Sequence, residues 1–318
     1  MDEEGIMTVA GDIGSRSGSA VTILMGTFNG ARFLEEQLLS IERQSYQNWH
    51  LVVSDDGSTD RTPHILAEFK SKVGAHRVTI RSGSAKGFAR NYLGLACDET
   101  IPGNFFAFGD QDDIWESDKL ARAVEWLTTV SPSVPALYCS RTRLIDETGK
   151  GVGLSRLFIG RPTFANALVQ SIAGGNTMVF NQATRQLIRL CGVTDAPTHD
   201  WLVYLLVTAT DGAVKYDRYP TVHYRLHAAN VIGNPPWSQR FDMLLSNQFQ
   251  IWVSENFAIL RSFRPHMSQH NAIIFDEFAK IREHHVAARI SALYRSGVYR
   301  TSVSGNIGLL GSVLLGKL

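Results

Sequence analysis

The chain has 318 residues, 44% of them hydrophobic and 19% charged, which is the composition of a globular protein with a sizeable core. Its net charge of +1 provides no strong positive field, so we expect no nucleic acid among its partners. The three cysteines are widely spaced and form no CxxC pair, which argues against a zinc site or a disulfide framework and favours a reducing cytoplasm.

Residues 1–20 combine an acidic start with a Gly/Ser-rich stretch and have no apolar core. They differ from a secretory signal, and we expect a disordered lead-in. No apolar run in the chain approaches the roughly 20 residues that a membrane-spanning helix needs.

Residues 21–130 alternate four times between strand-like and helix-like patterns. Strands are expected at residues 21–28, 49–54, 78–81 and 105–109, and helices at residues 31–44, 62–72, 87–99 and 117–129. This alternation predicts an α/β fold with a mostly parallel central sheet and helices on both faces. In such sheets ligands bind beyond the carboxyl ends of the strands, where this chain has small, polar or acidic segments.

Residues 131–233 are less regular. We expect strands at residues 136–145, 177–180 and 214–225, a helix from Asn181 to about Gly192, and a buried helix at residues 199–209. Asn234-Pro235-Pro236 is a strong breaker, and the pattern after it is helical almost to the last residue.

The segment Asp110-Gln111-Asp112-Asp113 directly follows the fourth strand. Three carboxylates so close together repel one another unless a cation or a hydrogen-bonded ligand lies among them. Asp110 and Asp112 point to the same side of an extended segment, and oxygen ligands suit Mg²⁺ or Mn²⁺. The alternative is a solvated acidic turn in which Asp113 or Ser117 caps the next helix.

A second acidic segment, Asp55-Asp56-Gly57-Ser58-Thr59-Asp60, follows the second strand. A carboxylate of Asp55 or Asp56 could accept hydrogen bonds from a ribose hydroxyl or a base N–H. For Asp60 we prefer a turn role at the start of the following helix. No GxGxxG follows the first strand and no GxxxxGK[ST] occurs, so the sequence does not favour a dinucleotide fold or a P-loop.

These segments, taken in order, resemble the family 2 inverting glycosyltransferases with a GT-A fold, and most of all the bacterial rhamnosyltransferases that build surface polysaccharides. The resemblance rests on Thr27-Phe28-Asn29-Gly30, Glu35 to Ile41 with Gln44, Ser54 to Asp60, Lys86 to Asn91, Asp110 to Trp115, Gly174-Gly175-Asn176, His199-Asp200-Trp201 and Tyr224 to Gly233. It covers residues 21–233, with a nucleotide-sugar half at 21–130 and an acceptor half at 131–233. Residues 234–318 would form a helical extension.

The resemblance implies roles on the donor side. The nucleotide sugar would be held by Thr27, Asn29, Asp55, Asp56, Arg90, Asn91 and Asp110. A divalent cation, Mg²⁺ or Mn²⁺, would be bound by Asp112 as the main ligand of a DxD motif, with Asp110 and His227. The role of Asp113 stays open, and His227 is alternatively an ordinary packed or surface histidine.

On the acceptor side, Asp200 matches the catalytic base that takes the proton of the incoming hydroxyl. The alternative is a carboxylate in the first turn of a helix, and both readings can hold together. The resemblance puts Gly174, Gly175, Asn176, His199 and Trp201 in the acceptor pocket.

The implied activity is metal-dependent, inverting transfer of a sugar to a glycan or lipid-linked glycan, with L-rhamnose from dTDP-rhamnose as the first expectation. A UDP-hexose donor is the alternative donor. A non-catalytic nucleotide-sugar binding or assembly protein is an alternative function. A nucleotidyltransferase ranks last, because the first loop has one glycine and no lysine.

The C-terminal residues are basic and amphipathic. Residues 281–300 carry four arginines and one acid, and Ile307, Leu310, Leu314 and Leu318 fall on one helical face. We expect a cytoplasmic protein whose last turns contact the inner face of the cell membrane, with packing on the catalytic domain or a partner chain as the alternative for the preceding helices.

Overall fold

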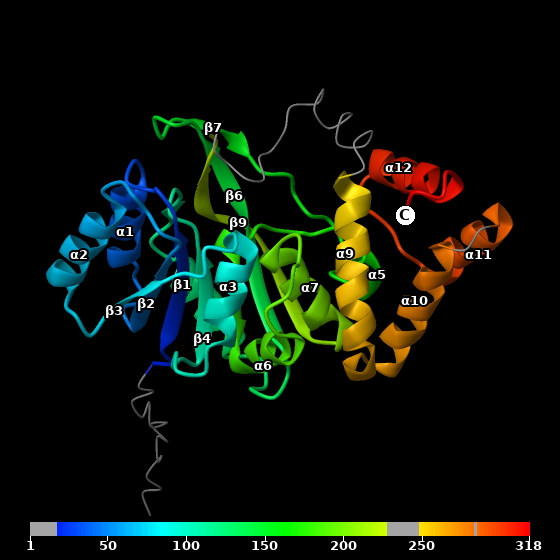
Figure 1. The fold of residues 1–318 in the computed structure, drawn as a ribbon, viewed down its shortest axis with the longest axis horizontal. Helices are drawn as coiled ribbons and strands as arrows, with labels where there is room; N and C mark the ends of the chain where they lie inside the picture. The colour runs from blue at the N-terminus through cyan, green and yellow to red at the C-terminus, as the bar shows by residue number, and fades with distance from the viewer. Residues whose placement is uncertain (1–17, 228–247, 283–284) are drawn as a thin grey trace, which may run out of the picture.

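The computed structural model describes residues 18–227, 248–282 and 285–318. A central sheet has helices on both faces, and the C-terminal helices gather on one side, far from the first two helices (Figure 1). The expected lead-in spans residues 1–20, and its residues 1–17 lie outside the described residues. So do the motif residues 228–233, the breaker at 234–236 and the expected domain boundary at 233/234.

The first half of the sheet is parallel. Its strands are β1 (Val21–Thr27), β2 (Trp49–Asp55), β3 (Val78–Ser82) and β4 (Phe105–Gly109), in the order β3-β2-β1-β4. Alternate side chains enter two cores: Leu24 and Phe106 pack on one face, and Ile23 and Ala107 on the other. The helices between the strands are α1 (Leu34–Glu42), α2 (Thr62–Val73), α3 (Phe88–Cys97) and α4 (Lys119–Leu127). The expected α/β fold with helices on both faces is confirmed.

The second half of the sheet is mixed. The order continues from β4 through β8 (Val179–Asn181), β6 (Ala136–Ile145) and β9 (Ala213–Arg225) to the two-residue strand β5 (Ile114–Trp115), and β7 (Gly151–Leu154) pairs with β6. Only β6 and β9 run parallel, whereas β8, β5 and β7 pair antiparallel with their neighbours. The parallel arrangement is therefore limited to the first four strands and the β6–β9 pair.

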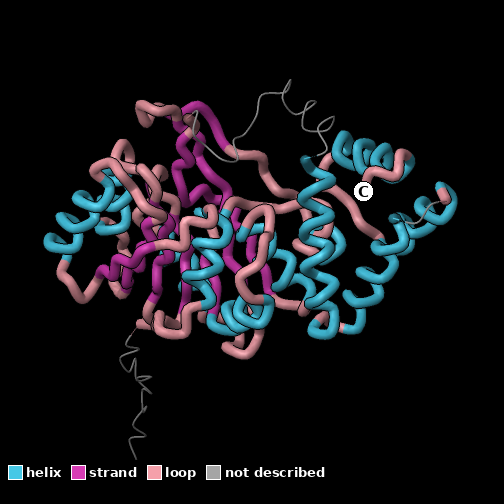
Figure 2. The backbone as a smooth tube through the Cα atoms, viewed as in Figure 1, coloured by secondary structure: helices cyan, strands magenta, loops and turns pink. Residues whose placement is uncertain are grey.

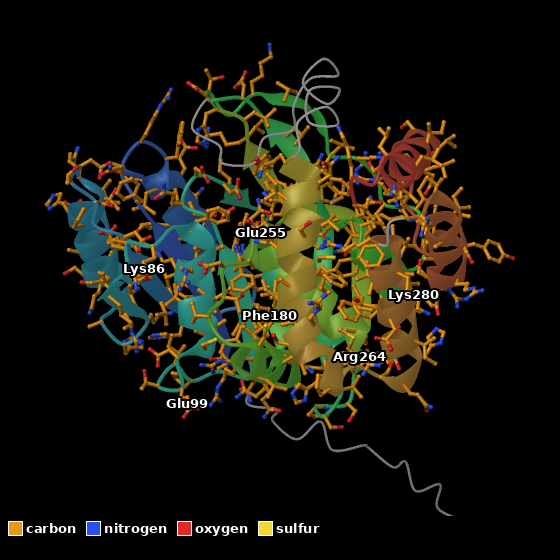
Figure 3. The ribbon with its side chains drawn as sticks, turned by 45° about the vertical axis from the view of Figure 1, so that its right-hand side comes forward. Lys86, Glu99, Phe180, Glu255, Arg264 and Lys280 are labelled. Atoms are coloured by element: carbon orange, nitrogen blue, oxygen red, sulfur yellow. The ribbon has the colours of Figure 1, made fainter. Side chains whose placement is uncertain are left out.

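Side-chain caps start the longer helices of this half. Asn181 accepts a hydrogen bond from the Thr184 amide at the start of α6 (Gln182–Cys191), and Thr198 accepts one from the Trp201 amide at the start of α7 (His199–Ala209). The helix predicted at residues 199–209 is confirmed. A one-turn helix α5 (Phe164–Ala167) and a 3₁₀ turn η1 (Gly175–Thr177) complete the region. Phe180 of β8 lies inside the molecule, whereas Glu99 and Arg264 lie at its edge (Figure 3).

The C-terminal helices share a core with the sheet and α7. They are α9 (Gln248–Phe263), η2 (Arg264–His266), α10 (Gln269–Ala279), η3 (Lys280–Arg282), α11 (Val286–Ser296) and α12 (Val303–Leu314) (Figure 2). Phe257 and Phe275 join Leu205 of α7 in one cluster of buried side chains, and Asn271 donates to the Thr208 carbonyl at 2.9 Å. Among the residues described, no helix is both long and apolar enough to cross a bilayer.

Candidate active site

The three carboxylates after β4 lie together. Asp110, Asp112 and Asp113 each offer an oxygen atom, and these atoms lie within 4.8 Å of one another. His227, two residues beyond β9, has its Nε2 2.8 Å from Asp112 Oδ2. The contact arises because β5, just after the carboxylates, pairs with β9 in the register Ile114 to His223. His227 is therefore not an ordinary surface histidine.

Asp113 is fully buried and has a structural role. Its carboxylate accepts hydrogen bonds from Asn176 Nδ2 and, at 3.3 Å, from the Arg225 amide. Helix α4 begins at Lys119, and the residue before it makes no side-chain cap. The alternative in which Asp113 or Ser117 caps this helix is therefore wrong.

The electrostatics of the cluster favour a bound cation. Burial, followed by the neighbouring charges of Asp112 and Asp200, raises the pKa of Asp110 to about 7, although the Tyr92 hydroxyl donates to it at 2.6 Å. A divalent cation would offset this repulsion, and the carboxylate oxygens and imidazole nitrogen are donors that Mg²⁺ and Mn²⁺ accept. The residues present fit such an ion.

Asp200 lies in the first turn of α7 and on the same side of the sheet. Its Oδ2 accepts from the Gly175 amide at 3.0 Å and its Oδ1 from the Trp201 amide at 2.7 Å. Its charge acts on Asp110, so the two carboxylates share one electrostatic environment. A carboxylate that starts a helix and faces the acidic cluster is compatible with both readings of the sequence.

Hydrogen bonds join the loops after the first three strands. Asp55 accepts from the Thr27 hydroxyl at 2.8 Å and from the Ser58 amide at 2.9 Å. Asn29 accepts from the Thr59 amide at 2.9 Å, and Asp56 accepts from the Ala85 amide at 3.0 Å. Four of the residues expected to hold the nucleotide sugar, Thr27, Asn29, Asp55 and Asp56, thus lie in one hydrogen-bonded group of loops.

Asp60 lies at the start of α2. It accepts hydrogen bonds from the amides of Ala31 and Thr62 at 3.0 and 2.9 Å. The preferred turn role of Asp60 is confirmed.

The two expected donor-side residues of α3 contact other protein groups. Asn91 is buried, and its Nδ2 donates to the Ser54 carbonyl at 3.1 Å, just before Asp55. Arg90 forms an ion pair of 2.5 Å with Asp195 in the segment before α7. Asn91 therefore ties α3 to the end of β2, and Arg90 ties α3 to the segment before α7.

The expected acceptor residues divide into exposed and buried groups. Gly174 is exposed, but Asn176, His199 and Trp201 are at most 4% exposed. Trp201 Nε1 donates to the Ala167 carbonyl at 2.7 Å, and the His199 ring stacks on Tyr92 with centroids 4.1 Å apart. Their burial leaves these three side chains little free surface for direct contact with an acceptor, and their acceptor role stays a prediction.

Gly175 allows the Gly174–Thr177 loop to pack closely against the start of α7. A Cβ atom built on it would lie 2.4 Å from His199 Nε2 and 3.3 Å from the Asp200 Cβ. A larger residue would displace the loop that bonds Asp200, so this position requires glycine.

The sequence argument missed four residues of the site. Tyr92 donates to Asp110, and Gln111 exchanges two hydrogen bonds with the backbone of Phe28. Arg225 is 1% exposed, donates to the Asp112 carbonyl at 3.0 Å and pairs with Glu36 at 2.5 Å. Lys119 is fully buried and lies electrostatically close to Asp110 and Asp113. Tyr92 and Lys119 had local readings as helix residues, whereas Gln111 and Arg225 lay within family motifs that gave them a signal but no role.

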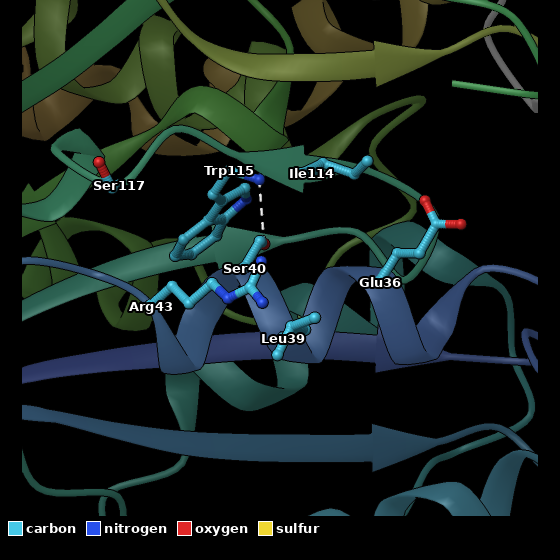
Figure 4. A pocket seen from close by; sticks show the side chains of 7 residues that line it. All are labelled: Glu36, Leu39, Ser40, Arg43, Ile114, Trp115 and Ser117. Atoms are coloured by element: carbon cyan, nitrogen blue, oxygen red, sulfur yellow. Dashed lines mark hydrogen bonds between the residues drawn. The ribbon is translucent and has the colours of Figure 1, made fainter. Parts of the chain in front are cut away.

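A separate pocket of about 250 Å³ lies between α1 and β5 (Figure 4). It is lined by Glu36, Leu39, Ser40, Arg43, Ile114, Trp115 and Ser117, and Ser40 Oγ accepts from the Trp115 amide at 3.0 Å. None of the clustered carboxylates lines it, so we assign the site to the acidic cluster.

Known proteins similar to this chain include bacterial sugar transferases. The chain is 29% identical over 223 residues to the dTDP-rhamnosyl transferase RfbG of Shigella flexneri, which covers 66% of this chain and 73% of that protein. It is 30% identical over 110 residues to the UDP-Glc:alpha-D-GlcNAc-diphosphoundecaprenol beta-1,3-glucosyltransferase WfgD of Escherichia coli, covering 34% of this chain and 40% of that protein.

Two solved structures share the fold. The mannosyltransferase PcManGT from Pyrobaculum calidifontis, in complex with GDP-Man and Mn²⁺, has a TM-score of 0.55 at 19% identity and covers 95% of this chain and 86% of that chain. TarS 1–349 of S. aureus, in complex with UDP-GlcNAc, has a TM-score of 0.52 at 14% identity, covering 88% and 93%.

The family model described as glycosyl transferase family 2 matches residues 22–187. That match includes the clustered carboxylates and Gly175, and the strands and helices around them form the expected fold. The chain therefore belongs to glycosyl transferase family 2 and is a glycosyltransferase.

Proposed function

We propose that the protein transfers a sugar from a nucleoside diphosphate donor to a glycan or lipid-linked glycan acceptor, with a divalent cation and with inversion of the anomeric centre. The observation that carries the proposal is the 2.8 Å contact of His227 with Asp112, in a cluster whose Asp110 is also within electrostatic reach of Asp200. A cation site beside a separate carboxylate base is the arrangement that such a reaction needs.

Asp112, Asp110 and His227 would hold the cation, Mg²⁺ or Mn²⁺. When bound, it would neutralise charge that grows on the departing nucleoside diphosphate. The group of Thr27, Asn29, Asp55 and Asp56 would bind the nucleoside through hydrogen-bond acceptors already oriented by the loops. The chain thereby orients the donor before the acceptor enters.

Asp200 would act as the base. Two backbone amides donate to its carboxylate and hold it in place. It would take the proton of the acceptor hydroxyl while that oxygen attacks the anomeric carbon from the face opposite the leaving group. The side chains of Asn176, His199 and Trp201 would act from behind by holding the Gly174–Thr177 loop.

For the donor we propose dTDP-rhamnose. The support is the similarity to RfbG over two thirds of this chain. A UDP-hexose is the competing donor, and it is supported by the shorter similarity to WfgD, whose printed substrate is UDP-Glc.

The donor can be identified by thermal-shift titration of dTDP-rhamnose and UDP-glucose, each with and without Mn²⁺. A ligand at 100 times its Kd stabilises the folded state by about 2.7 kcal/mol, so the true donor should raise the Tm several degrees more than the other. Equal shifts for both donors would contradict a rhamnose preference.

Transfer itself is tested with Asp200→Asn and Asp112→Ala in a donor-consumption assay with acceptor. Loss of a general base should lower kcat on the order of 100-fold or more, while the Asp200→Asn protein still shows the donor-induced Tm shift. Asp112→Ala should lose the Mn²⁺-dependent part of that shift. Asp118→Asn, a half-exposed aspartate before α4, is the control.

Near-wild-type turnover in both variants would remove the assigned roles. Strong donor binding by the wild type with no transfer to any acceptor would instead favour the non-catalytic binding protein. Asp200 argues against that alternative, because a protein that only binds a donor has no use for a base facing the acidic cluster.

We also propose that α12 contacts the membrane that would carry a lipid-linked acceptor. The side chains of Val303, Ile307, Leu310, Leu314 and Leu315 are 42–79% exposed. Residues 285–318 contain three arginines and one lysine and no Asp or Glu, which suits an anionic lipid surface. Arg289 and Arg300 bind backbone carbonyls within the protein, so the apolar side chains of α12 carry most of this proposal.

A further inference from the structure

Lys119 is a fully buried lysine next to the acidic cluster. It is the first residue of α4, and its Nζ donates to the Asn176 carbonyl at 2.7 Å. The same ammonium lies 3.8 Å from the centre of the Trp115 ring. Burying an ammonium is expensive unless nearby negative charge compensates it, so the position calls for an explanation beyond packing.

The compensating charge comes from the proposed metal site. Burial lowers the pKa of Lys119 to about 7, and the charges of Asp113 and Asp110 oppose that decrease. No carboxylate oxygen of the described residues lies within ion-pair distance of Nζ. The lysine therefore acts on the cluster by its charge, without direct contact, and on the Gly174–Thr177 loop by a hydrogen bond.

That loop connects three parts of the site. Asn176 Nδ2 donates to Asp113, the Gly175 amide donates to Asp200 at 3.0 Å, and the Asn176 carbonyl accepts from Lys119. Lys119 thus holds the segment that links the cluster to the proposed base.

We propose that Lys119 is a positioning residue, whose buried ammonium balances the charge of the Asp110, Asp112 and Asp113 cluster and fixes the Gly174–Thr177 loop so that Asp200 stays in place with or without a bound cation. This inference rests on the proposed function. The charge and the hydrogen bond have consequences of opposite sign. Without the ammonium the cluster is more negative and binds a divalent cation more tightly, whereas the freed loop lowers the rate of transfer.

The test compares Lys119→Met with Lys119→Gln and with Lys215→Met, which makes the same change at an exposed lysine of β9. Mn²⁺ affinity is measured from the electron paramagnetic resonance signal of free Mn²⁺, alone and with dTDP. We expect Lys119→Met to bind Mn²⁺ about 3–10-fold more tightly and to lose about 10-fold or more in kcat, since a unit charge at several ångströms changes affinity by this order. Lys215→Met should change neither quantity.

Lys119→Gln separates the two effects. It removes the charge but keeps a donor for the Asn176 carbonyl, so we expect the tighter Mn²⁺ binding of the Met variant and a smaller loss of kcat. A merely structural role would loosen the site and weaken Mn²⁺ binding in both variants, which would overturn the inference. Unchanged kcat in both would also overturn it.

Folding failures and failure of the proposed function remain distinguishable. If Lys119→Met does not fold, Lys119→Gln decides by its Mn²⁺ affinity. If neither folds in buffer with Mn²⁺, Lys119 is a requirement of the fold and the inference is wrong. If the wild type neither binds Mn²⁺ nor transfers a sugar, the proposed function itself is contradicted.

Discussion

His199 combines deep burial with a titratable ring. Neither of its ring nitrogens has a hydrogen-bond partner among the described residues, and its ring packs between Tyr92 and Phe108. Burial lowers the pKa of His199 to about 4. The ring is therefore neutral in the folded protein at neutral pH.

We predict that His199 makes the protein less stable in mild acid. The unfolded chain binds a proton at this residue near pH 6.5 and the folded protein only near pH 4, so the stability is complete above pH 6.5 and is lost as the pH falls towards 4. Between pH 7.5 and 5 the loss is about 2 kcal/mol. Urea unfolding at both pH values should show that His199→Leu reduces this loss.

An equal pH dependence in wild type and His199→Leu would contradict the prediction. The comparison is made as a difference of differences, because other groups also titrate between these pH values and contribute equally to both proteins.

At the scale of elements, Arg185 of α6 donates hydrogen bonds to backbone carbonyls at the C-terminal end of α3. Arg185 is 2% exposed and donates to the carbonyls of Ala96 and Ile101 at 2.8 Å each, and to that of Asp98. Two of these carbonyls belong to the last turn of α3 and the residue after it, where backbone acceptors have no helical partner.

Arg185→Met should therefore destabilise the protein by about 2–4 kcal/mol, because it leaves buried carbonyls without a donor. Arg189→Met is the matched control, one turn further along α6. It breaks an ion pair with the exposed Glu99 and should cost less than about 1 kcal/mol. Chemical denaturation gives both values, and similar losses in the two variants would refute the role of Arg185.

The elements that could be predicted were those with a local signal. The strand at residues 136–145 and the helix at 199–209 have the predicted bounds, because their apolar residues give a signal within the segments themselves. Strand β5 was missed, since its two residues become a strand only by pairing with β9 more than 100 residues away. Strand β7 was also missed, because all four of its residues are exposed and two are glycine.

The same distinction applies to the site. Asp110, Asp112 and His227 were expected as one group, and they do lie together. Lys119 and Arg225 were assigned no role, because a buried charge looks like a surface charge in a sequence. The burial of His199 and Trp201 likewise depends on the fold of α5 and β4 around them, which no spacing rule predicts.

At the scale of the whole molecule, the sheet and the C-terminal helices are joined by one core, while α12 presents apolar side chains outward. We predict that Ile307→Glu with Leu310→Glu reduces binding to vesicles of phosphatidylglycerol by about 10-fold or more. Each of these apolar side chains would contribute roughly 1.5–3 kcal/mol when it is buried in the bilayer. Flotation of the full chain with vesicles measures this.

The control is Val152→Glu on β7, which introduces the same charge at another exposed apolar residue and should leave vesicle binding unchanged. If the wild type floats equally with neutral and anionic vesicles, the charge argument is wrong. If the wild type does not float at all, α12 is not a membrane contact.

The contact of His227 with Asp112 joins residues 115 positions apart. A ribosome adds about 5–20 residues per second, so the aspartates leave it roughly 6–23 s before their histidine does. During synthesis the nascent chain therefore passes through a period in which its carboxylates lack this neighbour, and that period ends only when β9 has docked.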